Sequence, residues 1–300
     1  MTPFKKKINQ VDGIYLDQSF DSITKKVSDF YTKNPFPNYK PNDNKNTILT
    51  SGDKTYLKGL KKIVGYRKKI LEVGCGTGQF SNYFAIGSNN SIYALDPTLE
   101  SLKIAKRFSD KNNIKNVTYV NGSIFEDIFE EEYFDLVFCS GVLHHTKDTY
   151  LGFKKSINLL KKGGLILIGL YNSYSKLPVK KILYNFLGYK FISLIDPILK
   201  NSKISNEEKM AWVQDQYNHP VENSHSIEEV LNWFDNNKII PIAGIPEFNN
   251  INLYNIDQDL EDNKPVVANN RISIILKQIA MNFNILGGDG SLFCILGRKK

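Results

Sequence analysis

The stretch Lys69-Ile-Leu-Glu-Val-Gly-Cys-Gly-Thr-Gly-Gln79 decides the fold of this 300-residue chain. Its apolar first half predicts a buried strand, and the glycines at 74, 76 and 78 predict a tight turn after it. Glycine has no Cβ and tolerates positive φ, so such a turn lets the backbone come close to a ligand. The helix expected next, Phe80–Ile86, would point its N-terminal amides at the same place. The stretch therefore predicts a strand, a ligand-binding turn and a helix.

A second strand is expected at Ser91–Leu95, and Asp96 follows at its end. In wound α/β sheets a carboxylate at this position accepts hydrogen bonds from the hydroxyls of a ribose. Asp96 could also cap the next helix, Pro97–Phe108, and the two roles are compatible. The pair of strands predicts a site for a nucleoside.

The spacing of the glycines separates two classes of nucleoside site. The dinucleotide fingerprint is G-x-G-x-x-G, but here the third glycine comes one residue early and Gln79 holds its place. Glu72-Val-Gly-Cys-Gly-Thr-Gly78 instead resembles motif I of the class I S-adenosylmethionine-dependent methyltransferases. A nicotinamide dehydrogenase is disfavoured mainly because of this spacing.

Beyond this turn the chain alternates between strands and helices. This alternation predicts a parallel sheet with right-handed crossovers. Residues 1–20 show little periodicity, whereas 40–55 and 246–269 are predicted as polar loops and Gly287–Gly290 as a turn. The further strands are expected at Val117–Val120, Phe134–Cys139, Leu165–Leu170, Lys238–Ile245 and Leu292–Leu296.

Two further segments resemble the small-molecule branch of the same family: Ser140-Gly-Val-Leu-His-His145 and Leu160-Lys-Lys-Gly-Gly-Leu165. Phe30–Tyr39 resembles a segment that precedes the core in some bacterial methyltransferases of poorly defined substrate and folds over the cofactor pocket there. The resemblance implies an α/β, three-layer Rossmann-like sandwich with a seven-stranded, mostly parallel sheet. The implied strand order is 3-2-1-4-5-7-6, with the last strand antiparallel, a helical N-terminal extension and a helical lid insertion after strand five.

The implied organisation has four parts. Residues 1–64 form an N-terminal helical cap, and 65–170 form the cofactor-binding core. Residues 171–225 form a helical lid for the substrate, and 226–300 complete the core with a helical insertion.

The resemblance implies S-adenosylmethionine as cofactor and S-adenosylhomocysteine as product. Glu72 would approach the ammonium of the methionine tail, Asp96 would accept both ribose hydroxyls, and Ser123 would lie at the adenine, where the family often has an acid. Ser140 would lie near the sulfonium. All the residues expected to bind the cofactor come directly from or after the first four core strands: Glu72, Gly74, Cys75, Gly76, Gly78, Asp96, Pro97, Ser123, Ile124, Ser140 and Gly141.

Methyl transfer requires the nucleophile, the methyl carbon and the sulfur to be nearly collinear, so orientation supplies much of the rate. A base is needed only where the acceptor carries a proton. The candidate catalytic residues are His144 and His145 after strand four, Tyr171 at the end of strand five, and His219 in the polar stretch Asp215–His225. Each could instead have a structural role, such as hydrogen bonding or stacking.

Composition narrows the choice of partners. The net charge is +8, but the lysines are scattered and no arginine-rich stripe is present, so a nucleic-acid substrate is disfavoured. Cys75, Cys139 and Cys294 are far apart, which predicts reduced thiols in a cytoplasmic protein and neither a disulfide framework nor a metal site. No signal peptide or transmembrane helix is expected.

The expected activity is methyl transfer to an oxygen, nitrogen or carbon atom of a small-molecule acceptor. Two alternatives are an RNA or protein methyltransferase and a protein that binds S-adenosylmethionine without turnover. The apolar segment 177–199 could cover a hydrophobic acceptor, form a homodimer face, lie on a membrane or pack in the core.

Overall fold

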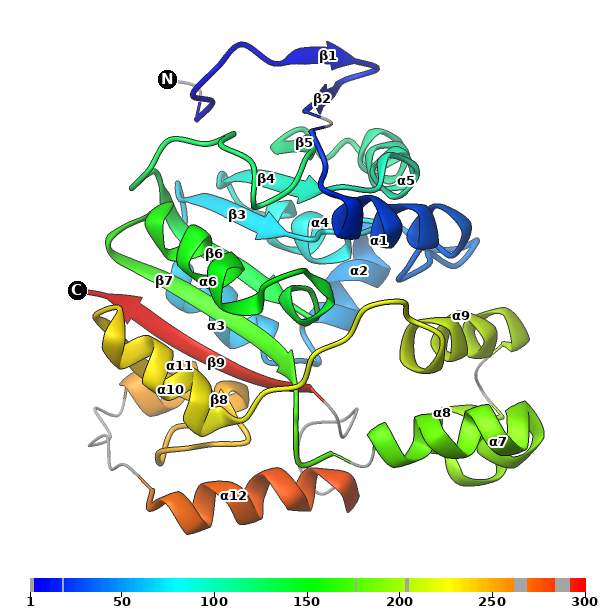
Figure 1. Cartoon of the computed structure of the whole chain (residues 1–300). Coiled ribbons are helices and arrows are strands. Elements are labelled where there is room, and N and C mark those ends of the chain that lie inside the picture. Colours follow the sequence, from blue (N-terminus) through cyan, green and yellow to red (C-terminus); the bar gives the residue numbers. More distant parts are fainter. Residues whose placement is uncertain (1–2, 18, 176, 203–204, 262–268, 284–291) are drawn as a thin grey trace.

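The computed structural model describes residues 3–300 apart from 18, 176, 203–204, 262–268 and 284–291. A single twisted sheet runs through the molecule, with helices on both of its faces (Figure 1). The turn predicted at Gly287–Gly290 lies outside the described residues.

The seven core strands follow the predicted order, β5-β4-β3-β6-β7-β9-β8. Strand β9 is antiparallel to both of its neighbours, whereas β3 to β7 pair in parallel. The 3-2-1-4-5-7-6 order is therefore confirmed. The strands are β3 (Lys69–Val73), β4 (Ser91–Asp96), β5 (Val117–Asn121), β6 (Phe134–Ser140), β7 (Leu160–Tyr171), β8 (Ile239–Ile245) and β9 (Leu292–Lys299).

The predicted count of seven strands is wrong, because the sheet has nine. Strands β1 (Asn9–Val11) and β2 (Ile14–Leu16) form a hairpin, and β2 adds in parallel to the edge strand β5. The turn residues Asp12 and Gly13 both have positive φ, which a two-residue hairpin turn requires. The N-terminal extension is thus not wholly helical, and strands of three residues are too short to show an alternating pattern.

The described helices are α1 (Ser22–Lys33), α2 (Lys45–Gly52), α3 (Leu57–Val64), α4 (Gln79–Ala85), α5 (Leu99–Lys111), α6 (Thr149–Asn158), α7 (Leu177–Ile195), α8 (Pro197–Lys200), α9 (Asn206–Tyr217), α10 (Ile227–Asn236), α11 (Ile256–Glu261) and α12 (Arg271–Ala280). Two of them correct the predicted polar loops. Helix α2 lies within 40–55, where the Asn44 side chain accepts from the Thr47 amide and caps it. Helix α11 lies within 246–269.

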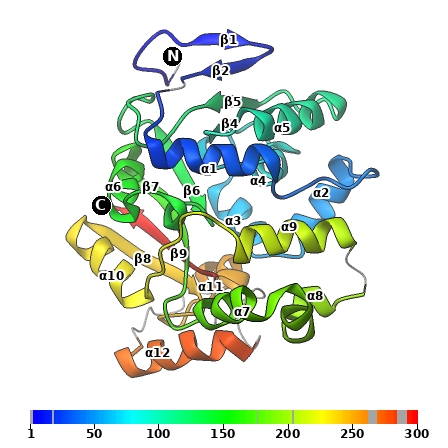
Figure 2. The ribbon, with the colours of Figure 1, turned by 45° about the vertical axis from the view of Figure 1, so that its right-hand side comes forward.

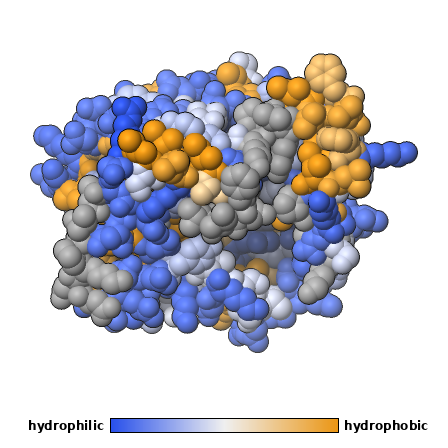
Figure 3. All heavy atoms as spheres, turned by 90° about the horizontal axis from the view of Figure 1, so that it is seen from below, coloured by the Kyte–Doolittle hydropathy of each residue, from blue (hydrophilic) through white to orange (hydrophobic). Residues whose placement is uncertain are grey.

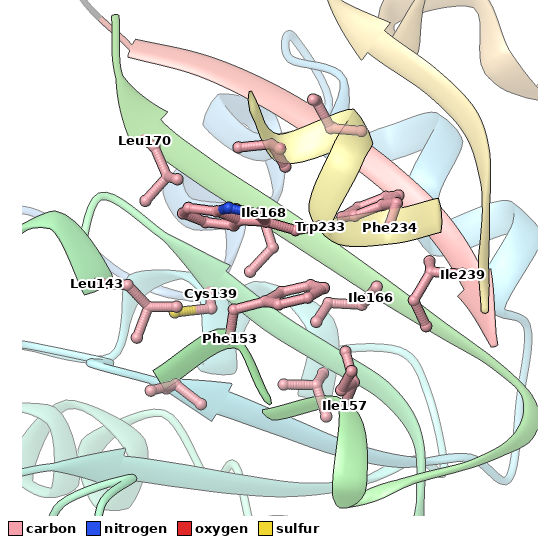
Figure 4. Close-up of a cluster of buried hydrophobic side chains, with 14 of the residues drawn as sticks. Cys139, Leu143, Phe153, Ile157, Ile166, Ile168, Leu170, Trp233, Phe234 and Ile239 are labelled. Atoms are coloured by element: carbon pink, nitrogen blue, oxygen red, sulfur yellow. The ribbon is translucent and has the colours of Figure 1, made fainter. Parts of the chain in front are cut away.

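Helices α6 and α10 pack on one face of the sheet, and α2, α3, α4 and α11 pack on the other. On the first face the Phe153 ring lies parallel to Phe234, 5.7 Å between centroids, and contacts Trp233 (Figure 4). Phe153 is fully buried. This aromatic cluster joins α6 to α10, so it fixes two helices that are more than seventy residues apart in the chain.

Helices α7 to α9 lie beyond the sheet and pack on one another through Ile192, Leu199, Val213 and Tyr217. In Figure 2, α9 lies below α1 and above α7 and α8. Helix α7 is broken at Gly188, whose φ of 72° is not helical. None of the described helices is both long enough and apolar enough to cross a membrane.

Replacing Phe153 with alanine should lower the free energy of unfolding by about 3–5 kcal/mol, because a cavity forms between α6 and α10. Denaturant titration measures this change. Tyr66→Ala is the control, since Tyr66 is exposed and its loss should change stability by less than about 0.5 kcal/mol. Equal effects in the two variants would contradict the packing described for this cluster.

Candidate functional site

A cavity of about 440 Å³ lies at the carboxyl ends of β3, β4, β6 and β7. Its volume is in the range of small-molecule and cofactor sites. Most of the residues around it are apolar, and two carboxyl groups, Glu72 and Asp96, lie on one side. This is the edge at which wound α/β sheets bind their ligands.

The glycine turn forms part of the cavity wall. Gly74 and Gly76 have φ values of 69° and 51°, in the left-handed region that favours glycine. A Cβ on Gly76 would collide with the carbonyl oxygen of Phe36, and one on Gly74 would collide with the side chain of Val142. Gly74 and Gly76 therefore have no room for side chains, and both line the cavity with backbone alone.

Asp96 binds the turn to the end of β4. One carboxylate oxygen accepts from the Gly76 amide at 2.7 Å, and the other accepts from the Thr98 amide at 2.7 Å. Burial raises the pKa of this carboxyl, and the two amides oppose the shift. Each carboxylate oxygen has two lone pairs, so Asp96 keeps acceptor capacity for a ligand on the cavity side.

Glu72 is buried at the end of β3 and lines the same cavity. Its Oε2 accepts from the Ser81 amide at 3.0 Å and from the Ser81 hydroxyl, which ties the strand to helix α4. Burial raises the pKa of Glu72 to about 8, the negative charge of Asp96 adds to the rise, and the Ser81 bonds oppose it. Two acids with raised pKa values thus share one wall, which favours a ligand that carries positive charge.

Ten of the eleven residues predicted to bind the cofactor line the cavity. The exception is Gly78, which is the N-cap of α4 in a left-handed conformation. A Cβ there would come within 2.9 Å of Ala105, so this glycine allows α4 and α5 to approach each other. Ser140 lines the wall from the end of β6, with its hydroxyl 3.8 Å from the Cys294 sulfur.

The other three candidate catalytic rings all lie next to His145, and only that of His219 stacks on it. The His145 and His219 rings stack with centroids 3.6 Å apart, and the Nδ1 atoms of both lie within hydrogen-bond distance of the Val221 carbonyl, at 2.8 and 2.6 Å. His144 is 4.2 Å from His145 between centroids. Of these histidines, His145 lines the cavity, whereas His144 and His219 lie behind it.

Tyr171 also lines the cavity, at the end of β7. Its ring stacks on His144 at 3.9 Å, and its hydroxyl accepts from the Gln216 amide at 2.5 Å. Gln216 is on α9, so this bond joins strand β7 to helix α9. The structure therefore brings Tyr171 and His145 together on the cavity wall, with ring centroids 5.5 Å apart.

The segment before the core covers the glycine turn, as its sequence predicts. The Thr77 hydroxyl donates to the Pro37 carbonyl, and the Asn82 amide donates to the Tyr39 hydroxyl at 2.9 Å. Phe36 lines the cavity. Tyr39 does not, because its ring stacks on Phe108 at 4.0 Å.

Sequence reasoning missed the residues that close the cavity from outside the core. Thr24, Val27 and Tyr31 contribute from α1, and Trp212 and Gln216 contribute from α9. Both sets have helical spacing, which was visible in the sequence, but spacing alone does not say whether a stripe faces a core or a ligand. Within the predicted lid, Tyr217 points away, and its hydroxyl donates to Asp196 at 2.6 Å.

The described residues contain no group of three or more histidine, cysteine, aspartate or glutamate side chains placed to hold a metal ion. The site is therefore built from a glycine turn, two buried acids and a cluster of aromatic and imidazole rings.

A sheet of this order, with a glycine turn after its first core strand and a buried acid after its second, defines the class I S-adenosylmethionine-dependent methyltransferases. Residues 66–238 match a family model described as a methyltransferase domain. The chain belongs to this methyltransferase family. The chain is 31% identical over 173 residues to a demethylmenaquinone methyltransferase of Staphylococcus aureus (strain MRSA252). This alignment covers 56% of the present chain and 69% of the relative.

Solved structures share the fold. Geranyl diphosphate C-methyltransferase from Streptomyces coelicolor A3(2), solved with Mg²⁺, geranyl diphosphate and S-adenosyl-L-homocysteine, aligns with a TM-score of 0.51 at 12% identity, over 93% of this chain and 99% of that one. A phosphoethanolamine N-methyltransferase of Haemonchus contortus aligns with a TM-score of 0.50 at 17% identity, over 91% of this chain and 60% of that one. The resemblance to class I methyltransferases is thus confirmed, and with it S-adenosylmethionine as the cofactor.

The raised pKa of Glu72 predicts how stability depends on pH in the protein without ligand. A folded-state pKa of about 8 exceeds the ordinary value of 4.5, so folding favours the protonated acid. The contribution of Glu72 is fully present below about pH 4.5 and is lost as pH rises through about 8, by a few kcal/mol in total.

Glu72→Gln should therefore gain stability relative to the native protein as pH rises from about 5 to about 8. Denaturant titrations across this range measure the difference. Glu100→Gln is the matched control, because Glu100 is exposed on α5. A constant difference between the native protein and Glu72→Gln would show that Glu72 ionises normally in the folded state.

Proposed function

We propose that this methyltransferase transfers a methyl group to a small, largely apolar acceptor molecule. One observation carries the proposal: the cavity that contains the glycine turn and Asp96 continues without interruption into an apolar wall. That wall comes from four separate elements, α1, α3, α9 and β9, through Tyr31, Leu57, Trp212 and Leu292. A cofactor and an acceptor would thus share one enclosed space.

The residues present fit S-adenosylmethionine, which supplies an activated methyl group when bound. Because Gly74 and Gly76 carry no side chains, their backbone could contact the amino-acid tail and the ribose of the cofactor. Asp96 would hold the ribose hydroxyls with the lone pairs that Gly76 and Thr98 do not use. Glu72 would meet the ammonium of the tail, and a cation beside it would lower its pKa again.

The proposed acceptor side is lined mainly by apolar side chains. Tyr31, Leu57, Trp212 and Leu292 would enclose an apolar ring or chain, which favours an acceptor of that kind over a charged polymer. The relative in Staphylococcus aureus is named for demethylmenaquinone, an acceptor with apolar character, which supports this assignment. The scattered lysines give no reason to prefer RNA as the acceptor.

His145 is the side chain best placed to take a proton from the acceptor. A carbonyl oxygen can only accept, so the contact with Val221 places the hydrogen of the neutral ring on Nδ1. Nε2 is then the basic nitrogen, as in a positioned general base. His219 would hold the ring in place by stacking, and Tyr171, fixed by Gln216 and His144, would orient the acceptor.

Asp96→Ala should weaken binding of S-adenosylmethionine by about a hundredfold or more, because hydrogen bonds to a buried charge are worth about 1.5–3 kcal/mol each. Isothermal calorimetry with S-adenosylmethionine, S-adenosylhomocysteine and NAD measures this. Asp110→Ala is the matched control, since Asp110 is exposed on α5 and its carboxylate pairs with Lys106. Binding of NAD, or undiminished binding by a folded Asp96→Ala variant, would overturn the cofactor assignment to this cavity.

His145→Asn should keep cofactor affinity and lose turnover by about 10²–10⁴-fold, the usual effect of a general base. The assay follows labelled methyl from S-adenosylmethionine into a panel of quinols, phenols and amines. His225→Asn is the control, because His225 contacts Glu229 and Trp233 outside the cavity wall. Full activity in His145→Asn would rule out the base, and tight cofactor binding with no product from any acceptor would favour a binding protein without turnover.

A further inference from the structure

Helix α12 presents an apolar stripe to solvent. Ile272, Leu276 and Ile279 follow helical spacing and are 71%, 60% and 40% exposed. Its buried side includes a polar residue, Gln278, which accepts from the Ile227 amide at 2.8 Å and donates to Glu228 at 2.7 Å. The helix is thus anchored partly by polar contacts, and its apolar stripe faces away from the core.

Helix α7 exposes apolar side chains in the same way. Phe186 and Leu194 are 83% and 67% exposed, and they lie on opposite sides of the break at Gly188. Seven of the seventeen large apolar side chains exposed in the described part of the chain are on α7, and three more are on α12. Single exposed apolar residues are normal on a protein surface, but a concentration of them on two helices indicates an interaction surface.

The two helices share one side of the molecule. In Figures 1 and 2 α7 and α12 both lie at the lower end. Figure 3, which views that end directly, shows apolar atoms gathered at two places on it, over α12 and over α7. The two apolar groups therefore face the same direction, as binding to an extended, flat surface requires.

The charge of these segments is strongly one-sided. Residues 177–200 and 271–280 contain six lysines and arginines and one acid, Asp196. Of the six cations, Lys277 is paired with Glu247 at 3.1 Å. Asp196 is buried, where it caps α8 and accepts from Tyr217, so it does not offset the surface charge. Lys190 and Lys200 are exposed beside the apolar side chains of α7 and α8.

We propose that the face formed by α7 and α12 docks on the surface of a lipid bilayer that contains anionic lipids. Apolar side chains flanked by lysines are the pattern of helices that lie in a membrane interface, with stems in the acyl boundary and cations at the phosphates. The described helices do not span a bilayer, so the docking is peripheral. A second copy of the chain fits less well, because two such faces would bring their lysines together.

This placement also connects the surface with the cavity. Helix α7 packs on α9, and α9 contributes Trp212 and Gln216 to the cavity wall. The lid helices therefore have one side on the membrane and another on the acceptor. The docking itself does not depend on the proposed methyl transfer, although an apolar acceptor held in the bilayer would give it a purpose.

Cosedimentation of the full chain with vesicles tests the proposal. The native protein should bind vesicles of phosphatidylcholine mixed with phosphatidylglycerol more tightly than phosphatidylcholine alone, and added salt should weaken binding several-fold. Phe186→Ser with Leu194→Ser, and separately Ile272→Ser with Leu276→Ser, should each lower the partition coefficient by at least about tenfold. Tyr66→Ser with Val11→Ser is the matched control, since both residues are exposed elsewhere.

Failure of the native protein to bind anionic vesicles would overturn the proposal, and so would equal binding by the α7, α12 and control variants. Size-exclusion chromatography with light scattering tests whether a second copy of the chain binds this face instead. A dimer that the α7 or α12 substitutions dissociate, in a protein that does not bind vesicles, would assign the face to a second copy. Calorimetry with S-adenosylmethionine on the same variants should show native affinity. Calorimetry reports on the cofactor site alone, and cosedimentation reports on membrane binding alone. A failure of the docking proposal can therefore be told apart from a failure of the proposed function.

Discussion

The carboxylate of Asp96 bridges two backbone segments that would otherwise be free to separate. It accepts from Gly76 in the glycine turn and from Thr98 at the start of the helix after β4, while the Leu95 carbonyl accepts from both Gly74 and Cys75. These bonds fix the turn against the end of the neighbouring strand. The cavity floor, the path of α4 and the contact of the turn with the segment around Phe36 all depend on that arrangement.

The core of the fold and the cofactor side of the cavity could be predicted from sequence because their determinants are local. A strand, a glycine turn and a helix occupy Lys69–Ala85 without interruption, and Asp96 directly ends the next strand. Parallel strands end at the same edge, so the residues that follow them must meet there. Strand order came from the family resemblance, since alternation alone permits several orders.

The rest of the site depends on contacts between distant segments, which no local pattern encodes. Helix α1 has the apolar spacing of a core helix, yet Val27 and Tyr31 face the cavity. Trp212 and Gln216 reach it only because α7 to α9 fold back across the sheet edge. The hairpin β1–β2 was missed for another reason. Strand β2 pairs with the edge strand β5 at Tyr119, and β1 pairs only with β2, so the stability of the hairpin depends on that edge rather than on its own residues.

Helix α12 shows that an apolar stripe does not by itself identify the buried face of a helix. On α12, Ile272, Leu276 and Ile279 are exposed, whereas the buried side includes Gln278 bonded to α10. In the cavity, Glu72 and Asp96 are likewise buried although burial opposes their ionisation and raises their pKa values. A core that stored two such acids for stability alone would gain from replacing them with apolar side chains. Their presence on the cavity wall is therefore best explained by a ligand that uses both groups. In the proposed placement of S-adenosylmethionine, its ammonium would meet Glu72 and its ribose hydroxyls would meet Asp96.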